Sequence, residues 1–188
     1  MSTQTETRCP WCLRDDLYMN YHDKEWGRPS YDEQHLFEMM VLESFQAGLS
    51  WYTILAKREN FRQAFAGFDV VKVSNFNEED IARLMDDVGI VRNRAKILAA
   101  IHNASLFMRL QQQYGKFSNY IWQFTDYKVI DKYPEHMSDV PSTTAESDVM
   151  AKDMKKRGFK FMGSTVCYAN MQSIGMVNDH LMSCRARK

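Results

Sequence analysis

The chain has 188 residues, of which 45% are hydrophobic and 26% are charged, and these values fit a single globular domain over residues 1–188. They exclude a largely disordered, collagen-like or low-complexity chain. The 24 basic residues balance the 24 acidic residues, which argues against a protein that coats nucleic acid non-specifically.

Helical signals follow one another along most of the chain. The expected helices cover about residues 30–46, 50–66, 78–87, 92–114, 118–124, 145–157 and 165–174. Ser30 followed by Glu33 has the form of a capping box, and Gly67 and Gly115 are placed to end two later helices. Residues 126–143 are polar and contain two prolines, which indicates a surface connection. Because no segment alternates like a β-strand, the sequence predicts an all-α fold.

The sequence also bears on location. No stretch approaches the ~20 apolar residues of a membrane-spanning helix, and residues 1–8 lack the apolar region of a signal peptide. We therefore expect a cytoplasmic protein with no membrane partner. In that compartment, the four cysteines point to a metal site or to free thiols before disulfides.

Four possible zinc ligands lie near the two ends of the chain. Cys9 and His22 stand at the N-terminal end, and His180 and Cys184 are four residues apart at the other, a spacing that shares one face of a helix or helical turn. Two thiolates and two imidazoles make a closed tetrahedral zinc site, which would tie the chain ends together. The alternative is two buried thiols and two surface histidines. It stays open because the two pairs of ligands are far apart in the sequence, unlike the closely spaced ligands of zinc fingers.

Cys12 offers a second interpretation of the N-terminal cysteines. Cys9 and Cys12 form a C-x-x-C pattern, which is typical of a redox pair or of two ligands to one metal. A thioredoxin-like site follows a strand and opens a helix, and neither is evident here. Cys9 is therefore preferred as the ligand, while Cys167 lies in an apolar helical pattern and is expected in the core.

A carboxylate falls on the apolar face of the first predicted helix. Glu43 shares a stripe with Leu36 and Met40, since two helical turns separate it from Leu36. A buried carboxylate must be paired, hydrogen-bonded or protonated. The turn over residues 46–51 can bring Glu43 and Trp51 together around a pocket. The alternative is that Glu43 pairs with an Arg or Lys, or lies at the helix border.

Aromatic residues strengthen the interpretation of this region as a pocket. The candidates are Trp11, Tyr18, Tyr21, Trp26 and Trp51. Aromatic faces around one acceptor suit a flat, hydrogen-bonding and cationic ligand, and a nucleobase fits this description. The alternative is that some of these aromatic residues belong to the core.

A glycine turn joins two of the predicted helices between residues 84 and 97. This segment, with Gly89 in its turn, resembles the hairpin of the helix-hairpin-helix DNA-binding motif, in which exposed amides and a helix N-terminus meet a phosphate. Arg92, Arg94 and Lys96 are expected to add positive charge for DNA. Val91 stands where that motif has its second glycine. The alternative is a common pair of helices joined by a turn.

These features are found together in one family. The stretches that carry the resemblance are Arg8–Cys9, Tyr21–Gly27, Leu36–Glu38, Leu42–Glu43, Gln46–Trp51, and Lys155–Phe161 through Val177–His180. These stretches span nearly the whole chain. Through them the sequence resembles the bacterial DNA-3-methyladenine glycosylase I (TAG) family of helix-hairpin-helix glycosylases. Phe45 departs from the family pattern, in which this position is often polar.

The resemblance implies a monomeric enzyme that hydrolyses the N-glycosidic bond of 3-methyladenine in double-stranded alkylated DNA, without lyase activity. The damaged base would be flipped into the aromatic pocket. There Glu43 would recognise the adenine edge and would be the candidate catalytic residue. The implied substrate-binding residues are Glu43, Trp51, Tyr21, Trp11 and Tyr18. The implied ligands of one structural Zn²⁺ are Cys9, His22, His180 and Cys184.

The resemblance also implies how the chain meets DNA. Leu49 would fill the gap left in the duplex, and Gly89, Arg92 and Arg94 would contact the backbone. A helix-hairpin-helix lobe is expected over about residues 32–125, and a zinc lobe over about residues 1–31 plus 142–188. Two other functions stay open: a zinc-containing module that binds damaged DNA without catalysis, and a thiol-redox protein that uses Cys9 and Cys12.

Overall fold

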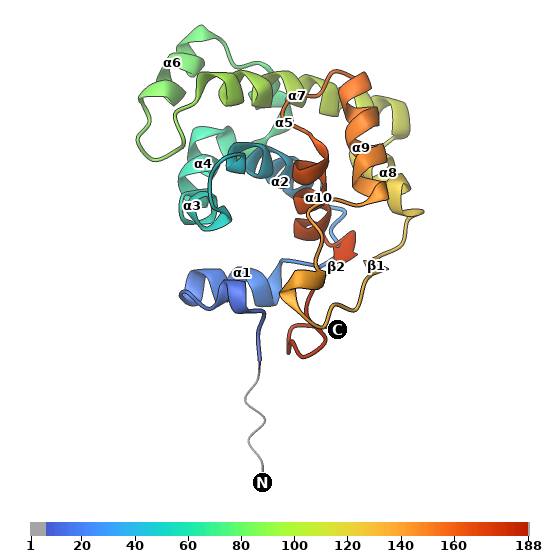
Figure 1. Ribbon diagram of the computed structural model, residues 1–188. Helices are drawn as coiled ribbons and strands as arrows, with labels where there is room; N and C mark the ends of the chain where they lie inside the picture. Colours follow the sequence, from blue (N-terminus) through green and yellow to red (C-terminus); the bar gives the residue numbers. More distant parts are fainter. Residues whose placement is uncertain (1–6, 188) are drawn as a thin grey trace.

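The computed structural model describes residues 7–187, which form a helical molecule whose two chain ends lie together beside α1 (Asp16–Lys24) (Figure 1). The amide of Arg185 donates to the carbonyl of Thr7 at 2.8 Å, which joins the first described residues to the last. No helix in the described residues is long and apolar enough to cross a membrane. The expectations for residues 1–6 and for Lys188 lie outside the described part of the chain.

Ten α-helices account for most of residues 7–187. After α1 they are α2 (Glu33–Gln46), α3 (Trp51–Ala56), α4 (Arg58–Ala64), α5 (Val70–Ser74), α6 (Glu78–Asp86), α7 (Arg94–Tyr114), α8 (Phe117–Trp122), α9 (Ala145–Lys156) and α10 (Ser164–Ser173). Short 3₁₀ turns are η1 (Pro10–Cys12), η2 (Ala66–Phe68), η3 (Gln123–Thr125) and η4 (Met137–Asp139). The all-α prediction is confirmed in its main point. The exception is one parallel pair of two-residue strands, β1 (Ile130–Asp131) and β2 (Val177–Asn178).

Three local predictions were wrong. Helix α1, capped by Asp15, and helix α5, capped by Asp69, were not expected from the sequence. The helix predicted over residues 50–66 is two helices, α3 and α4, which meet at Lys57. The predicted capping box does not form, because Asp32 is the N-cap of α2. The Glu33 carboxylate instead accepts from the first two backbone amides of α8, at 2.7 and 2.9 Å, and so ties α8 to α2.

Helix α2 runs through the centre of the molecule, with α3, α7 and α10 around it (Figure 1). All ten residues from Leu36 to Phe45 are buried, so α2 has no solvent-facing side over this stretch. A helix covered on all sides is apolar around its whole circumference, apart from polar groups that have a partner or a function. Glu38 and Glu43 are the two acidic residues in this stretch, and their surroundings are very different.

Glu38 belongs to a buried ion-pair network that fixes α2 against α4. It accepts from Nε of Arg58 at 2.8 Å and from Nε of Arg62 at 2.7 Å. Arg58 also donates to Glu25 at 2.7 Å, beyond the end of α1. Burial raises the pKa of Glu38, but the hydrogen bonds from Arg58 and Arg62 outweigh this effect and hold the pKa below its ordinary value. The network therefore sets α1, α2 and α4 in one relative position, and the candidate site lies between α1 and α2.

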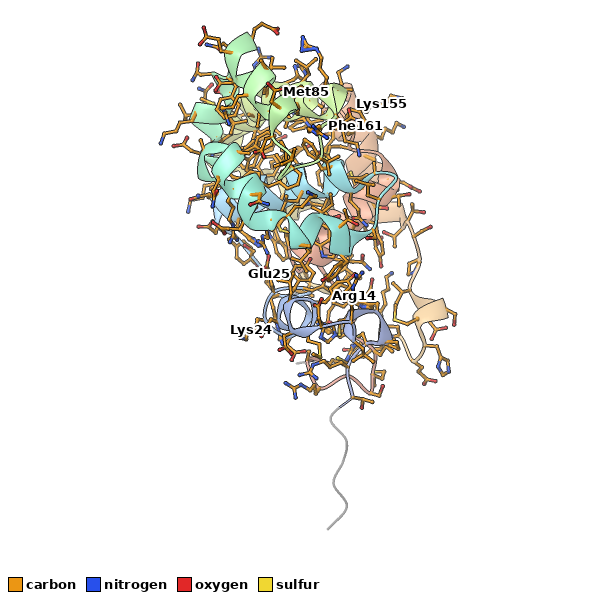
Figure 2. All side chains as sticks on the ribbon, turned by 90° about the vertical axis from the view of Figure 1, so that its left-hand side faces the viewer. Arg14, Lys24, Glu25, Met85, Lys155 and Phe161 are labelled. Carbon is orange, nitrogen blue, oxygen red and sulfur yellow. The ribbon has the colours of Figure 1, made fainter. Side chains whose placement is uncertain are left out.

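The two ends of the molecule carry different parts of the fold. Figure 2 shows Arg14, Lys24 and Glu25 at the end formed by α1, whereas Met85 of α6 and Lys155 of α9 lie toward the opposite end. The turn between α6 and α7 is thus remote from the joined chain ends, and the cavity described below lies between these regions.

Candidate functional site

A cavity of about 390 Å³ lies between α1, α2, α3 and α10. Its lining residues are Trp11, Tyr18, Tyr21, Trp26, Glu43, Gln46, Trp51, Met137, Val140, Pro141, Ser142, Ala169 and Gln172. The structure thus brings all five candidate aromatic residues and Glu43 to one cavity. The volume is in the range of pockets that hold a small organic ligand.

Glu43 is buried without a cationic partner. It is 4% exposed, and its Oε2 has no hydrogen-bond partner in the described residues. Burial raises the pKa of Glu43 to about 8, and a hydrogen bond with the Ser173 side chain opposes only part of this effect. The alternative that Glu43 pairs with an Arg or Lys does not hold within residues 7–187, where Glu38 has that role instead. An ionisable acceptor without a partner, facing a cavity, is the feature expected of a binding site.

The aromatic rings contact one another as the walls of the cavity. The ring centroid of Trp11 lies 4.9 Å from that of Tyr18 and 5.0 Å from that of Trp26, both edge-on. Tyr21 and Trp51 lie 5.4 Å apart. The indole Nε1 of Trp51 is buried without an acceptor. Flat faces with one carboxyl group suit a planar, positively charged ligand.

Part of the cavity wall comes from segments to which the sequence analysis gave no functional role. Met137, Val140, Pro141 and Ser142 belong to the stretch expected to be a surface connection. Ala169 and Gln172 are three residues apart on α10, on one helix face. The prolines and small residues of the first segment look like those of any loop, so the sequence carries no local signal of its place against the aromatic walls.

Lys96 of α7 holds the turn between α2 and α3 by two hydrogen bonds. The Lys96 ammonium group donates to the carbonyl oxygens of Phe45 and Ala47 at 2.7 and 2.6 Å. These are carbonyls at the end of α2 that have no partner within the helix. The expectation that Lys96 adds charge for DNA was therefore wrong, since its side chain is buried under the turn. Leu49, at the tip of this turn, is 41% exposed.

The α6–α7 turn has the compact form expected of a hairpin. The amide of Gly89 donates to the Asp87 side chain at 2.7 Å. A Cβ atom at Gly89 would lie only 2.9 Å from that carboxylate and 3.1 Å from Asn60, so a side chain does not fit without displacement. Arg92 is exposed, and Arg94 pairs with Glu78 at 3.3 Å on the surface.

Three of the four candidate metal ligands lie together where the chain ends meet. The ligand atoms of Cys9, His22 and Cys184 are within 4.8 Å of one another, and all three residues are buried. The Cys9 thiol donates to the sulfur of Cys184, which lowers the pKa of Cys184 and raises that of Cys9. Nδ1 of His22 is 2.8 Å from Asp23, and its Nε2 is 3.5 Å from the Cys184 sulfur. Two thiols and an imidazole are donors that suit zinc.

His180 is adjacent to this group, but its ligand atoms are not part of it. Its ring lies 4.8 Å from the ring of His22, and its Nδ1 is 3.0 Å from the Asn178 side chain. The idea that His180 and Cys184 share a helical face was wrong, because both follow β2 in non-helical backbone. Cys12 also stands outside the group, and its thiol donates to the carbonyl of Cys9 at 3.2 Å.

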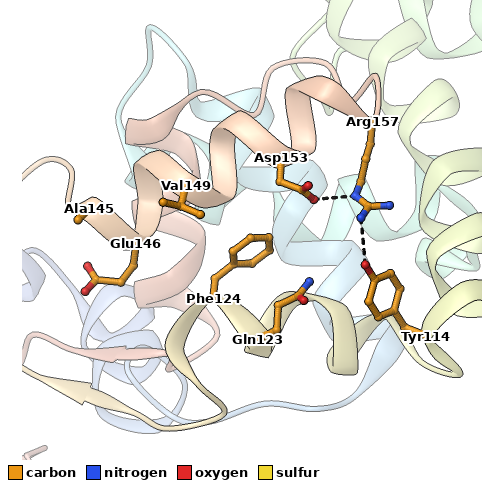
Figure 3. A pocket seen from close by; sticks show the side chains of 8 residues that line it. All are labelled: Tyr114, Gln123, Phe124, Ala145, Glu146, Val149, Asp153 and Arg157. Carbon is orange, nitrogen blue, oxygen red and sulfur yellow. Dashed lines mark hydrogen bonds and ion pairs between the residues drawn. The ribbon is translucent and has the colours of Figure 1, made fainter.

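A second cavity, of about 490 Å³, lies beside α9 (Figure 3). Arg157 donates to Asp153 at 2.6 Å and to the hydroxyl of Tyr114 at 2.9 Å. Asp153 also accepts from Tyr120. Arg157 and Asp153 thus pair with each other, and the remaining charged lining residue, Glu146, is part-exposed and hydrogen-bonded to Thr144. This cavity therefore lacks the buried, unpartnered carboxyl group of the aromatic cavity and is the weaker candidate.

Comparisons with known proteins agree on one group of relatives. A family model described as methyladenine glycosylase matches residues 11–188. The chain is 48% identical over 177 residues to DNA-3-methyladenine glycosylase 1 of Escherichia coli, covering 94% of this chain and 95% of that protein. It is 46% identical over 178 residues to DNA-3-methyladenine glycosylase of Haemophilus influenzae, covering 95% and 96%.

Solved structures give the same result for the fold. A crystal structure of 3-methyladenine DNA glycosylase I (TAG) matches with a TM-score of 0.93 at 45% identity, covering 97% of this chain and all of that one. The structure that describes 3-methyladenine recognition by the Staphylococcus aureus protein also has a TM-score of 0.93, at 37% identity and 97% coverage of both chains.

Proposed function

Because the chain belongs to the methyladenine glycosylase family, we propose that it is an enzyme that hydrolyses the N-glycosidic bond of 3-methyladenine in alkylated DNA. The reaction releases the base and leaves an abasic site for base excision repair. The observation that carries this proposal is the buried carboxyl group of Glu43, which has no cationic partner and faces an aromatic cavity. The experiment is a base-release assay on methylated duplex DNA. DNA binding without release of 3-methyladenine would point to a damage-binding module instead.

Glu43 is proposed as the recognition residue of the flipped base. Methylation at N3 makes adenine a cation, and aromatic faces with a carboxylate favour a cation over neutral adenine. Trp51 and Tyr21 are proposed to stack on the base, with Trp11 and Tyr18 as further walls. The carboxylate attracts the positively charged methylated base and gains no such attraction from undamaged adenine, which is neutral. This difference gives the site its selectivity.

The chemistry needs little assistance from the protein. The positively charged base leaves as a neutral molecule, so no acid has to protonate it. Binding of the cation accelerates the reaction only where the interaction is stronger in the transition state. Glu43 is the acidic residue among those lining the cavity, and we therefore propose it also as the group that stabilises positive charge developing on the sugar.

The rate of excision is expected to rise with pH up to about pH 8. Glu43 is neutral below its pKa of about 8 and becomes a carboxylate above it, while the methylated base in DNA keeps its charge. The value of kcat/KM should therefore climb by about tenfold per pH unit below the pKa and level off above it. Single-turnover rates between pH 6 and pH 9 measure this, and a flat profile would contradict the proposed role of the carboxylate.

Leu49 and the hairpin are proposed to contact the duplex. Leu49 would occupy the gap left by the flipped base, while Gly89, Arg92 and Arg94 meet backbone phosphates. Their support is position: Leu49 is exposed at the tip of the turn that leads into the cavity, and the hairpin presents Arg92 to solvent. On this proposal, a hairpin lobe of about residues 32–125 and a zinc lobe of about residues 1–31 plus 142–188 act as one cytoplasmic monomer.

Leu49→Ala is expected to lower excision from duplex DNA by roughly 10-fold while leaving the affinity for free 3-methyladenine unchanged. The wedge compensates for unstacking, which costs a few kcal/mol and is absent when the base is already free. Leu17→Ala is the control, because Leu17 is similarly exposed, at 45%, on α1. Equal losses in the two variants would argue against a wedge at Leu49.

We propose that zinc is held by Cys9, His22 and Cys184, with His180 as the fourth ligand. The residues fit this metal, since Asp23 contacts Nδ1 of His22 and Asn178 contacts Nδ1 of His180. In His22, Nε2 is then the nitrogen left for a metal, as is usual for oriented histidine ligands. In His180, Nε2 lies 3.3 Å from the backbone carbonyl oxygen of His22, so this ring would exchange that contact for the metal. Four protein ligands leave no position for water, so the ion would be structural.

A further inference from the structure

Gln172 lines the cavity together with Glu43, and the proposed recognition has no role for it so far. It lies on α10, and its side-chain Nε2 donates to Oδ2 of Asp179 at 2.8 Å. The same oxygen accepts from the hydroxyl of Tyr168 at 2.5 Å. Asp179 is 1% exposed, so this carboxyl group is fixed within the protein.

The contact with Asp179 decides which way the Gln172 amide faces. A carboxylate oxygen accepts hydrogen bonds, whereas an amide has a donating end and an accepting end. Because Asp179 holds the donating end, the carbonyl Oε1 of Gln172 is the free end, and it has no hydrogen-bond partner within residues 7–187. Oε2 of Glu43 is buried without a partner, so Glu43 and Gln172 each bring an acceptor to the lining of the cavity.

We propose that Gln172 is a specificity-determining residue, which accepts a hydrogen bond from the exocyclic amino group of 3-methyladenine, and that Asp179 is its positioning residue. This inference rests on the proposed function. In 3-methyladenine attached to the sugar, the N–H donors are the two on the exocyclic amino group, so two acceptors match them. Glu43 and Gln172 each take one hydrogen of that group.

The base that Gln172 rejects is 3-methylguanine. It is also a cation, so the carboxylate and the aromatic walls attract both bases. At the position of the adenine amino group, however, guanine carries a carbonyl oxygen, which is an acceptor. Two acceptors facing each other in a buried site leave both unsatisfied, and this is costly. Charge thus selects methylated purines, and Gln172 selects adenine among them.

Gln172→Met tests the proposal, because methionine has a similar length and no hydrogen-bonding ends. Single-turnover release of 3-methyladenine and of 3-methylguanine is measured on the same methylated duplex DNA. The ratio of the two rates, adenine over guanine, is expected to fall by roughly 10- to 100-fold. Gln123→Met, in the second cavity, is the control and is expected to keep the wild-type ratio.

Two further variants separate recognition from a general structural effect. Gln172→Asn keeps an amide with an accepting end and is expected to retain more of the ratio than Gln172→Met. Asp179→Leu frees the Gln172 amide to turn, and its ratio is expected to fall in the same direction as that of Gln172→Met. Thermal melting checks that each variant is folded. If a variant at one of the two positions, Gln172 or Asp179, does not fold, the variant at the other position still tests the proposal.

The outcomes also separate this inference from the proposed function. If wild-type protein releases 3-methyladenine and folded Gln172→Met keeps the wild-type ratio, Gln172 does not determine specificity, while the proposed function stands. If both release rates fall equally in Gln172→Met, the residue shapes the cavity and the inference is likewise overturned. If the wild-type protein releases no 3-methyladenine, the proposed function itself fails.

Discussion

Replacing Glu43 with glutamine is expected to lower excision of 3-methyladenine on the order of 100-fold and, at the same time, to raise the thermal stability of the protein. The amide keeps the size of the carboxyl group but cannot become negatively charged. A hydrogen bond to a charged group contributes about 1.5–3 kcal/mol, and the upper part of that range corresponds to a factor of about 100. Affinity for the free base and single-turnover excision rates measure the loss.

The gain in stability follows from the raised pKa of Glu43. The folded protein holds this proton up to about pH 8, whereas the unfolded chain releases it near pH 4.5. The stability contributed by the protonated form is therefore complete below pH 4.5 and is lost as the pH rises toward 8. At pH 7 the loss is roughly 3 kcal/mol, at 1.36 kcal/mol per pKa unit. Glutamine avoids it, so the variant should melt several degrees higher at pH 7 and match the wild type near pH 4.

Glu38→Gln is the matched control, since Glu38 is also buried on α2 but is paired with Arg58 and Arg62. Here the ionised form is the one that the protein stabilises, and loss of the charge leaves buried guanidinium groups without a counterion. This variant should be less stable than the wild type and should keep its discrimination for the methylated base. A Glu43→Gln protein that unfolds in the same way would show that Glu43 has a structural role as well.

The sequence was sufficient to place Glu43 because one long helix carries the pattern. The spacing of Leu36, Met40 and Glu43 decides which side chains share a face, and it holds whatever surrounds the helix. Because this face is apolar, the spacing was enough to predict that Glu43 is buried. The next helix begins at Trp51, and the short turn before it was enough to place the two residues near each other. What the spacing could not show is that α2 is buried all around, because that depends on α7 and α10 far along the chain.

Other parts of the site could not be predicted because they depend on contacts between distant segments. Lys96 looked like a charge available for DNA, and only the fold shows that the carbonyls of Phe45 and Ala47 occupy it. Gln172 has no sequence signal, since its role depends on Asp179 and on the position of α10 against the cavity. A sequence shows helix propensity and hydrophobic periodicity, whereas the roles of Lys96 and Gln172 depend on how distant segments pack together.

Loss of the proposed zinc site has the largest expected effect on stability. A metal that joins Cys9 to Cys184 closes a loop of nearly the whole chain, and loop-closure entropy makes this worth about 5 kcal/mol. Cys184→Ser is therefore expected to lose the bound metal and to melt about 10–20 °C lower than the wild type. Elemental analysis of the purified protein and thermal melting measure the two effects, with one zinc per chain expected in the wild type.

Cys12→Ser is the control for this variant. Cys12 is also fully buried, lies three residues from Cys9 and stands outside the group of candidate ligands, and a serine hydroxyl can keep its bond to the Cys9 carbonyl. This variant should retain its metal and melt close to the wild type. If Cys12→Ser were the variant that lost zinc, Cys12 would be the ligand in place of a residue assigned above.

The same variant distinguishes a structural metal from a catalytic one. The ring of Trp11 contacts both His22 and the aromatic walls, at 5.2 Å from His22 and 4.9 Å from Tyr18, so the metal site and the cavity share a side chain. Unfolding of the joined chain ends would therefore remove a wall of the cavity. Excision by Cys184→Ser should persist at low temperature and disappear at the temperature where the variant melts. A variant that melts like the wild type but is inactive at every temperature would assign the metal to the chemistry.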